Sequence, residues 1–164
     1  MIYYTVLPSP VGELTLIAEQ DALIGLWFDG QQSGLTEAVL DPAHPILATS
    51  TNWLKAYFDG KNPTTQDIPV RFYGSSFQKR VWKHLCHIPY GETATYGEIA
   101  KTVAKEMGKE KMSAQAVGNA VGANPISIIV PCHRVLGAGG KITGYTGGLE
   151  KKKILLQLEH IPYK

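Results

Sequence analysis

The sequence predicts an α/β (α+β) protein of two domains, and three observations support this prediction. Short apolar runs separated by Pro, Gly and Asp fill the first part of the chain, which is typical of strands. From Gly74 onward, apolar residues recur every three or four positions, the spacing of amphipathic helices. A chain of 164 residues can hold one large domain or two small ones. We therefore expect an N-terminal domain over residues 1–73 and a C-terminal domain over residues 74–164.

The N-terminal domain is predicted to combine a β-meander with one helix. Pro, Gly and Gln-Asp breaks between its first three apolar runs favour antiparallel pairing, and these runs cover residues 2–7, 13–18 and 22–28. Residues 45–58 carry apolar side chains along one helical stripe, which ends at Asp59-Gly60. Residues 68–72 predict a further strand. Residues 1–73 contain no Cys and no clustered carboxylates or histidines, so we expect the chemistry to lie in the C-terminal domain.

Four helices are predicted in the C-terminal domain. Three of them begin at hydroxyl residues that can cap a helix, namely Ser76, Thr95 and Ser113. Glu98 completes a capping box with Thr95. The Thr95 hydroxyl can accept a hydrogen bond from the backbone N–H of Glu98, and the Glu98 carboxylate can accept one from the backbone N–H of Thr95. The third helix covers residues 114–121 and the last covers residues 149–160. Two helices joined by a turn, as in the second and third here, fit a helix-turn-helix.

The third helix has an unusual outer face. Its predicted inward residues are Ala114, Val117 and Val121, and its predicted outward residues are Gln115, Gly118, Asn119 and Gly122. A glycine in a helix interior costs about 1 kcal/mol, so these glycines need a physical reason. Close packing against another element is one reason, and close approach of a ligand is the other; composition alone favours packing.

Cys132 lies where a reactive thiol is expected. Residues 126–130 are apolar and β-branched and predict a buried strand that ends at Pro131. His133 and Arg134 follow the cysteine, and a neighbouring base and cation favour a thiolate. The alternative is a buried, inert thiol beside a core histidine, and Cys86 on its helix fits that description.

The last helix carries one residue that is expensive to bury. Its predicted inward residues are Ile154, Leu155 and Leu158, and Glu159 shares that apolar edge. A carboxylate there needs a partner. Lys151 to Lys153 are read as a solvated face.

Composition excludes several classes of protein. The formal net charge is +2, the charged fraction is 18%, and no apolar run reaches the length of a membrane span. We therefore expect no membrane association. Two cysteines do not make a disulfide framework, which favours a cytoplasmic protein. One Cys and one His at a turn lack zinc spacing, so no metal is predicted. The glycine-rich loops of residues 137–148 lack a phosphate-loop fingerprint.

Several motifs together closely resemble O6-alkylguanine-DNA alkyltransferases. They are Val130-Pro131-Cys132-His133-Arg134-Val135, Asn124-Pro125-Ile126, Gly144-Tyr145-Thr146-Gly147-Gly148, Leu158-Glu159, Phe77-Gln78 with Val81-Trp82, Ile88 to Thr93 and Thr95 to Ala100. The match covers residues 74–160; residues 1–73 match mainly at Ser9-Pro10-Val11-Gly12. The resemblance implies a ribonuclease-H-like N-terminal domain and a winged-helix-like C-terminal domain. It also implies repair of O6-alkylguanine, and of O4-alkylthymine, by stoichiometric and irreversible alkyl transfer without a cofactor.

The resemblance also implies roles for individual residues. Cys132 would accept the alkyl group, His133 would be the general base acting through a water, and Glu159 would orient it. Asn124 would hold the active-site turn, and Tyr96 would supply a proton toward N3 of the leaving guanine. Residues expected to line the guanine pocket are Val135, Tyr145, Thr146 and Gly147. Residues expected to contact the minor groove of double-stranded DNA, from which the damaged base is flipped, are Thr95, Tyr96, Gln115, Ala116, Gly118 and Asn119. Arg134 would be structural.

One departure and three alternatives remain. Similar proteins often carry an arginine at position 115, and Gln115 predicts weaker DNA binding or slower flipping. The alternatives are a lesion-binding protein without transfer, a methylation-sensing transcriptional activator and a cysteine hydrolase that recycles. The presence of Cys132 argues against the first, and the lack of an additional DNA-binding domain in these residues argues against the second. We expect a monomer, because DNA contact through one slim helix needs no dimer symmetry.

Overall fold

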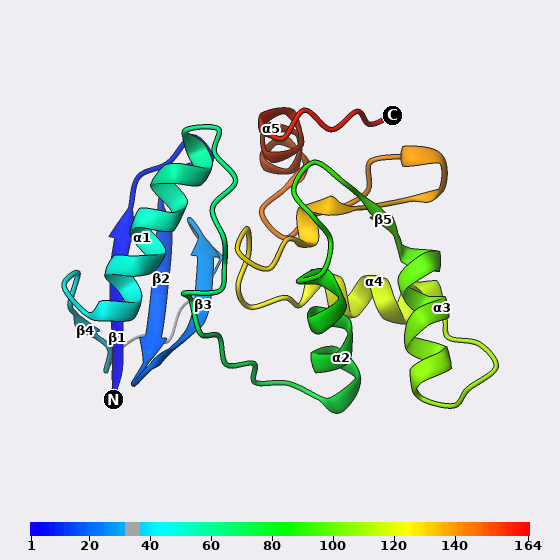
Figure 1. Cartoon of the computed structure of the whole chain (residues 1–164), viewed down its shortest axis with the longest axis horizontal. Coiled ribbons are helices and arrows are strands. Elements are labelled where there is room, and N and C mark those ends of the chain that lie inside the picture. The colour runs from blue at the N-terminus through cyan, green and yellow to red at the C-terminus, as the bar shows by residue number, and fades with distance from the viewer. Residues whose placement is uncertain (32–36) are drawn as a thin grey trace. The chain divides into compact units, whose positions relative to one another are not determined.

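The computed structural model describes residues 1–31 and 37–164, which form two compact units. The first unit comprises Met1–Tyr73 and Pro125–Ile129, and the second comprises Gly74–Asn124 and Val130–Lys164 (Figure 1). The predicted division into residues 1–73 and 74–164 therefore misassigns one segment. Residues 125–129 belong to the first unit, because Leu26 binds the chain on both sides of Ile126: its N–H donates to Pro125 O, and its carbonyl accepts from Ser127 N–H.

The first unit contains a four-stranded sheet, and the predicted meander is confirmed. Its strands are β1 (Ile2–Leu7), β2 (Leu14–Glu19), β3 (Ala22–Phe28) and β4 (Val39–Leu40), in the order β3-β2-β1-β4. β1, β2 and β3 pair antiparallel, while β4 pairs parallel to β1. The sequence did not predict β4, which is only two residues long. Gly12, at φ 94°, lies in the turn between β1 and β2, where a side chain would strain the backbone.

Helix α1 (Pro45–Phe58) covers this sheet and matches the predicted range (Figure 1). Pro45 suits the first helical position because its missing N–H would have no partner there. His44 precedes the helix, and its Nδ1 accepts a hydrogen bond from Ile46 N–H at 3.2 Å. Leu47 and Leu54 are completely buried against the sheet, so the apolar stripe read from the sequence does form the core.

Two predicted strands are wrong. Residues 68–72 and 126–130 each form one isolated bridge, between Val70 and Leu23 and between Ile126 and Leu26. Prolines explain both cases, because Pro69 and Pro125 accept hydrogen bonds from β3 through their carbonyls but have no N–H with which to extend a ladder. Beyond the second bridge the chain turns sharply at Ile128, whose φ is 69°.

The second unit is built on three helices that pack together. They are α2 (Ser76–Leu85), α3 (Tyr96–Glu106) and α4 (Ala114–Gly122). The Thr95–Glu98 capping box and the Ser113 cap are confirmed, but α2 is capped by Ser75 rather than by Ser76. Trp82 joins α2 to α4, since its indole Nε1–H donates to Ala120 O at 2.8 Å in the interior. Within α4, Ala120 is buried in place of the predicted Ala114, which is exposed.

The rest of the second unit carries the segment around Cys132. The short strands β5 (Ala94–Thr95) and β6 (Val135–Leu136) pair parallel, and β6 follows a 3-10 turn, Cys132–Arg134. A second 3-10 turn covers Ala138–Gly140, and the last helix is α5 (Leu149–Leu158).

Besides Ala114, two further inward predictions fail in this unit. Ile154 is 37% exposed, and Leu156 takes its place against Leu136 and Ile161. Cys86, expected inside, is exposed where α2 ends. No helix among the described residues is long and apolar enough to cross a membrane.

Candidate active site

Cys132 lies in the wall of a cavity of about 400 Å³. The thiol residue is only 2% exposed and begins the 3-10 turn between Pro131 and β6. Asn124 holds the chain just before this turn, because its Nδ2 donates to Val130 O at 2.9 Å in the interior. The cavity is lined by Tyr96, Gly118, Val121, Gly122, Cys132, Gly144, Tyr145 and Thr146.

The structure brings five of the fourteen predicted site residues to the lining of this cavity. Those in its lining are Tyr96, Gly118, Cys132, Tyr145 and Thr146. Those outside the lining are Thr95, Gln115, Ala116, Asn119, Asn124, His133, Val135, Gly147 and Glu159. Of the second group, Asn124, His133, Val135 and Glu159 are buried, and Gln115 and Asn119 are exposed on α4. The sequence did not single out Val121, Gly122 or Gly144 as lining residues, since nothing distinguishes them locally from other small or apolar residues.

Glu159 is the centre of a buried polar network. Its carboxylate accepts hydrogen bonds from His133 Nε2 at 2.6 Å and from Arg134 at 2.8 and 3.1 Å. The Gly91 backbone N–H donates to the same group at 3.0 Å. Arg134 also donates to Ile88 O at 2.7 Å. The costly carboxylate that the sequence placed on the last helix is therefore paired by four donors, and Arg134 is turned toward it.

These contacts define the charges of the pair. Burial alone would raise the pKa of Glu159, but the hydrogen bonds from His133, Arg134 and Gly91 lower it to about 2, so this carboxylate is ionised. Burial lowers the pKa of His133, against the attraction of Glu159, so the imidazole is neutral. A carboxylate can only accept, so the neutral ring donates Nε2–H, and Nδ1 is its basic nitrogen.

The thiol of Cys132 is neutral at rest, which corrects the thiolate expected from its neighbours. Burial raises its pKa, although hydrogen bonds with Asn124 and Tyr145 and the charge of Lys152 act in the opposite direction. Arg134, the nearest cation in the sequence, forms an ion pair with Glu159 instead. The site therefore needs a base to remove the thiol proton.

Lys152 contradicts the prediction of a solvated lysine face. Its side chain is completely buried, and Nζ donates to Val135 O at 2.8 Å. Burial lowers its pKa to about 8. Helical spacing offers a signal that the prediction did not use, because Lys152 lies three and four residues before Leu155 and Leu156, which are buried on the same face.

Two hydrogen bonds fix the loop that contains Thr143 and Thr146. The hydroxyls of Tyr96 and Thr143 are 2.7 Å apart, and Thr146 Oγ1 donates to Gly122 O at 2.7 Å. Burial raises the pKa of Tyr96, so its phenol keeps its proton. Among residues 1–31 and 37–164, no three His, Cys, Asp or Glu side chains cluster as metal ligands.

Taken together, the fold and the cavity define a helix-turn-helix unit that carries a buried cysteine in a cavity wall. Family descriptions match both units: "6-O-methylguanine DNA methyltransferase, ribonuclease-like domain" over residues 2–72, and the corresponding "DNA binding domain" over residues 76–161. The chain therefore belongs to the 6-O-methylguanine DNA methyltransferase family.

Individual relatives agree with this assignment. Methylated-DNA–protein-cysteine methyltransferases from Haemophilus influenzae and Mycobacterium bovis are 39% and 44% identical. These alignments cover 99% and 97% of this chain and 88% and 93% of the relatives. The crystal structure of Mycobacterium tuberculosis OGT in complex with DNA is similar with a TM-score of 0.84 and 44% identity. That comparison covers 96% of this chain and 92% of the crystallised one.

Replacing the buried carboxylate tests the network. We expect Glu159→Gln to lower the free energy of unfolding by about 3 kcal/mol at neutral pH, because it leaves Arg134 buried without its counter-charge. The folded-state pKa is below the unfolded value of 4.5, so the loss is complete above pH 4.5 and shrinks as the pH falls toward 2. Urea denaturation measures it. Glu150→Gln is the matched control, since the exposed Glu150–Lys153 pair contributes little.

The buried lysine makes a second prediction. The pKa of Lys152 is about 8 in the folded chain and 10.5 in the unfolded one, so the folded state binds fewer protons and gains stability as the pH rises between these values. The unfolding free energy of the wild type minus that of Lys152→Met should therefore increase from pH 8 to 10.5. Lys151→Met should show no such trend; a flat difference for Lys152→Met contradicts the assignment.

Proposed function

We propose that this protein repairs O6-alkylguanine, and with it O4-alkylthymine, in double-stranded DNA by moving the alkyl group onto Cys132. The observation that carries the proposal is a single thiol in a cavity wall, next to a histidine whose ring is bound to a buried carboxylate. This is the arrangement of nucleophile, base and orienting group that activates a neutral thiol. Membership of the 6-O-methylguanine DNA methyltransferase family supplies the class of substrate.

The first half of the reaction creates the nucleophile. His133 Nδ1 takes the proton of the Cys132 thiol through a water, and Glu159 stabilises the imidazolium that forms. The thiolate then attacks the alkyl carbon in line with the carbon–O6 bond. A carbon–sulfur bond forms as the carbon–oxygen bond breaks, and its electron pair remains on guanine.

The second half lets the base depart. The protonated phenol of Tyr96 donates toward guanine N3, so the base leaves neutral, and the phenolate regains the proton that the thiol released. Overall, the thiol proton replaces the alkyl group on guanine, and no cofactor takes part. A thioether is a poor leaving group, so each molecule acts once and the transfer is irreversible.

The loop over the cavity would bind the damaged base. Tyr145 and Thr146 line the cavity, and the Thr146 hydroxyl is anchored on Gly122 O. Val135 and Gly147 complete the proposed contact surface. The Val135 carbonyl already accepts Lys152 Nζ–H and has a second lone pair for an amino group of the base.

Helix α4 is the element that we propose to enter the minor groove, with Thr95 and Tyr96 beside it. A Cβ built on Gly122 would meet no atom within 4 Å, and one on Gly118 would lie 3.8 Å from the Tyr96 ring. Packing inside the protein thus gives no reason for either glycine. A slim helix suits a groove about 6 Å wide, and flipping the base out of the stack would bring it to the cavity. Exposed Gln115 and Asn119, with Ala116, complete this face.

The proposed context is a cytoplasmic monomer. Cys86 and Cys132 are both free thiols, as a reducing compartment favours. One α4 helix in the groove requires no symmetry partner.

Intact-mass spectrometry tests the transfer. After incubation with a duplex that contains O6-methylguanine, the protein should gain the mass of one CH₂ group on Cys132, and Cys132→Ala should gain none. Cys86→Ala is the matched control and should be methylated like the wild type. Binding without a mass gain would indicate a lesion-binding protein, and repeated turnover would indicate a hydrolase; either result rejects the proposal.

Residue 115 provides a separate test of the DNA face. We expect Gln115→Arg to bind DNA more tightly or to transfer methyl faster, because arginine adds charge and bulk where the flipped base leaves a gap. Single-turnover kinetics and fluorescence anisotropy measure the two quantities. Equal or weaker affinity together with no faster transfer would show that Gln115 does not limit the reaction.

A further inference from the structure

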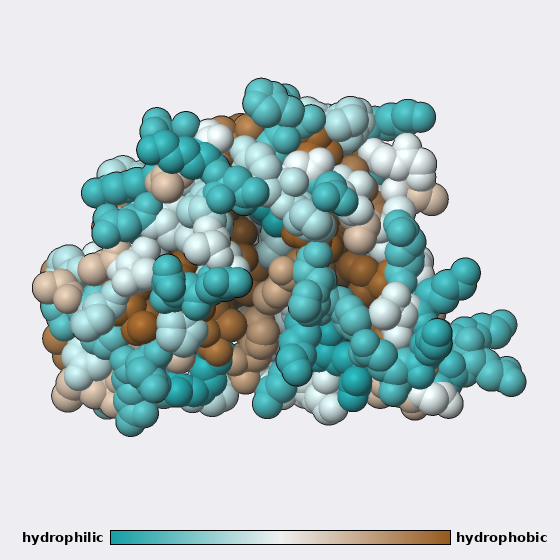
Figure 2. Space-filling model, viewed as in Figure 1, coloured by the Kyte–Doolittle hydropathy of each residue, from teal (hydrophilic) through white to brown (hydrophobic). Residues whose placement is uncertain are grey.

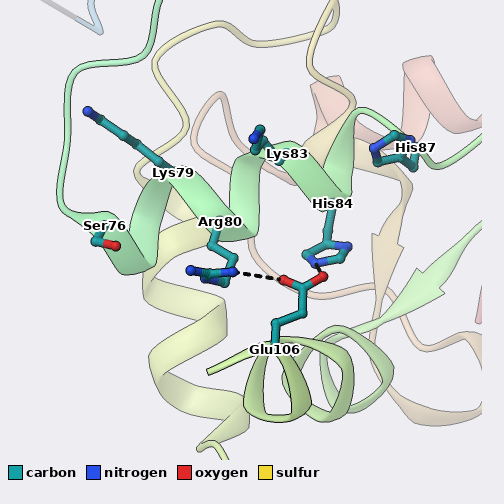
Figure 3. A pocket seen from close by; sticks show the side chains of 7 residues that line it. All are labelled: Ser76, Lys79, Arg80, Lys83, His84, His87 and Glu106. Atoms are coloured by element: carbon teal, nitrogen blue, oxygen red, sulfur yellow. Dashed lines mark hydrogen bonds and ion pairs between the residues drawn. The ribbon is translucent and has the colours of Figure 1, made fainter. Parts of the chain in front are cut away.

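A second cavity, of about 440 Å³, lies in the second unit and has a basic lining. It is bordered by Ser76, Lys79, Arg80, Lys83, His84 and His87 on and just after α2, and by Glu106 at the end of α3. Figure 3 shows Arg80 and His84 turned toward Glu106, while Lys79 extends away from it. None of these residues belongs to the cavity of Cys132.

The charge of this cavity is unbalanced. Lys79, Arg80 and Lys83 are permanent cations and Glu106 is the one carboxylate in the lining, which leaves two net positive charges, as many as the whole chain carries. Glu106 is already bound to Arg80 at 3.3 Å and to His84 at 2.9 Å. No carboxylate of the described residues forms an ion pair with Lys79 or Lys83, and both lysines are exposed. Figure 2 shows hydrophilic residues gathered over α2.

Two features of α2 disfavour this arrangement in the absence of a ligand. Lys79 and Lys83 are four positions apart, so two like charges lie on one helical face. Arg80 Nε is buried and has no hydrogen-bond acceptor in the described structure. An anion in the cavity would relieve the repulsion between the lysines and offer acceptors to the surrounding donors.

We propose that this surface, defined as Lys79, Arg80 and Lys83, binds phosphates of the same DNA duplex whose damaged base enters the cavity of Cys132. The inference rests on the proposed function. Trp82 fixes α2 to α4, so the surface is rigidly linked to the helix proposed to enter the groove. Helix α3 runs from Tyr96 beside Cys132 to Glu106 at the surface, about 15 Å at 1.5 Å per residue. That is less than half of the ~34 Å turn of B-DNA, so the proposal requires the bound duplex to extend about half a turn beyond the lesion.

The spacing of the cations favours a repeating anion. Lys79 and Lys83 are one helical turn apart, about 6 Å along α2. A DNA backbone presents phosphates in regular succession and can place a separate phosphate at each lysine. Such contacts would position the duplex without reading its sequence.

The salt dependence of DNA binding tests the proposal. The dissociation constant of a fluorescently labelled, unmodified duplex is measured by anisotropy over a range of salt concentrations. Each phosphate that the protein no longer neutralises should reduce the magnitude of the slope of log K against log salt by about 0.9. The double variant Lys79→Gln/Lys83→Gln should therefore reduce it by about 1.8. Lys55→Gln/Lys61→Gln in the first unit removes the same charge and should leave the slope unchanged.

Two results would overturn the proposal. They are an unchanged slope in the α2 double variant, or an equal change of slope in both double variants. Methyl transfer by the wild-type protein is measured in parallel: its absence rejects the proposed function, whereas its presence with an unchanged slope rejects only the phosphate surface. Circular dichroism establishes that both variants are folded.

Discussion

The buried carboxylate of Glu159 is the interaction on which the rest of the second unit depends. It joins three separate parts of the chain: the end of α5, the turn that contains His133 and Arg134, and the loop at Gly91. A buried carboxylate is tolerated only when most of its lone pairs are satisfied, and here four hydrogen bonds do so. The same bonds hold the imidazole in one orientation and one tautomer. The hydrogen bonds that stabilise the second unit therefore also fix the ring of His133.

The environment of Cys132 keeps its thiol protonated in the resting protein. Hydrogen bonds from His133 and Arg134 keep Glu159 ionised, and the buried ring of His133 is neutral. Lys152 is the buried amine whose charge favours the thiolate, but desolvation of the sulfur is the stronger effect. A protonated, buried thiol is less prone than a thiolate to oxidation and to attack on stray electrophiles.

The sequence predicted those features that depend on few neighbouring residues. The capping box of Thr95 and Glu98 and the range of α1 are local, and Glu159 was noticed because burying a carboxylate demands a partner. Residues 68–72 and 126–130 were misread as strands, since a β-branched run does not reveal that each segment pairs with β3 at a single bridge. Lys152 shares the buried face of α5 with Leu155 and Leu156 at helical spacing, but the sequence does not show the Val135 carbonyl that binds its Nζ in the interior.

The assignment of residues 125–129 to the first unit limits how far the two units are separable modules. The chain leaves the second unit after Asn124, bonds to Leu26, and returns at Val130, two residues before the thiol. A fragment starting at Gly74 would keep every residue of the Cys132 cavity and yet lose the β-strand that anchors Ile126. Removal of the N-terminal unit would therefore take away Leu26, the hydrogen-bond partner of Pro125 and Ser127. A residue about a hundred positions earlier in the sequence thus holds the segment that leads to the Cys132 turn.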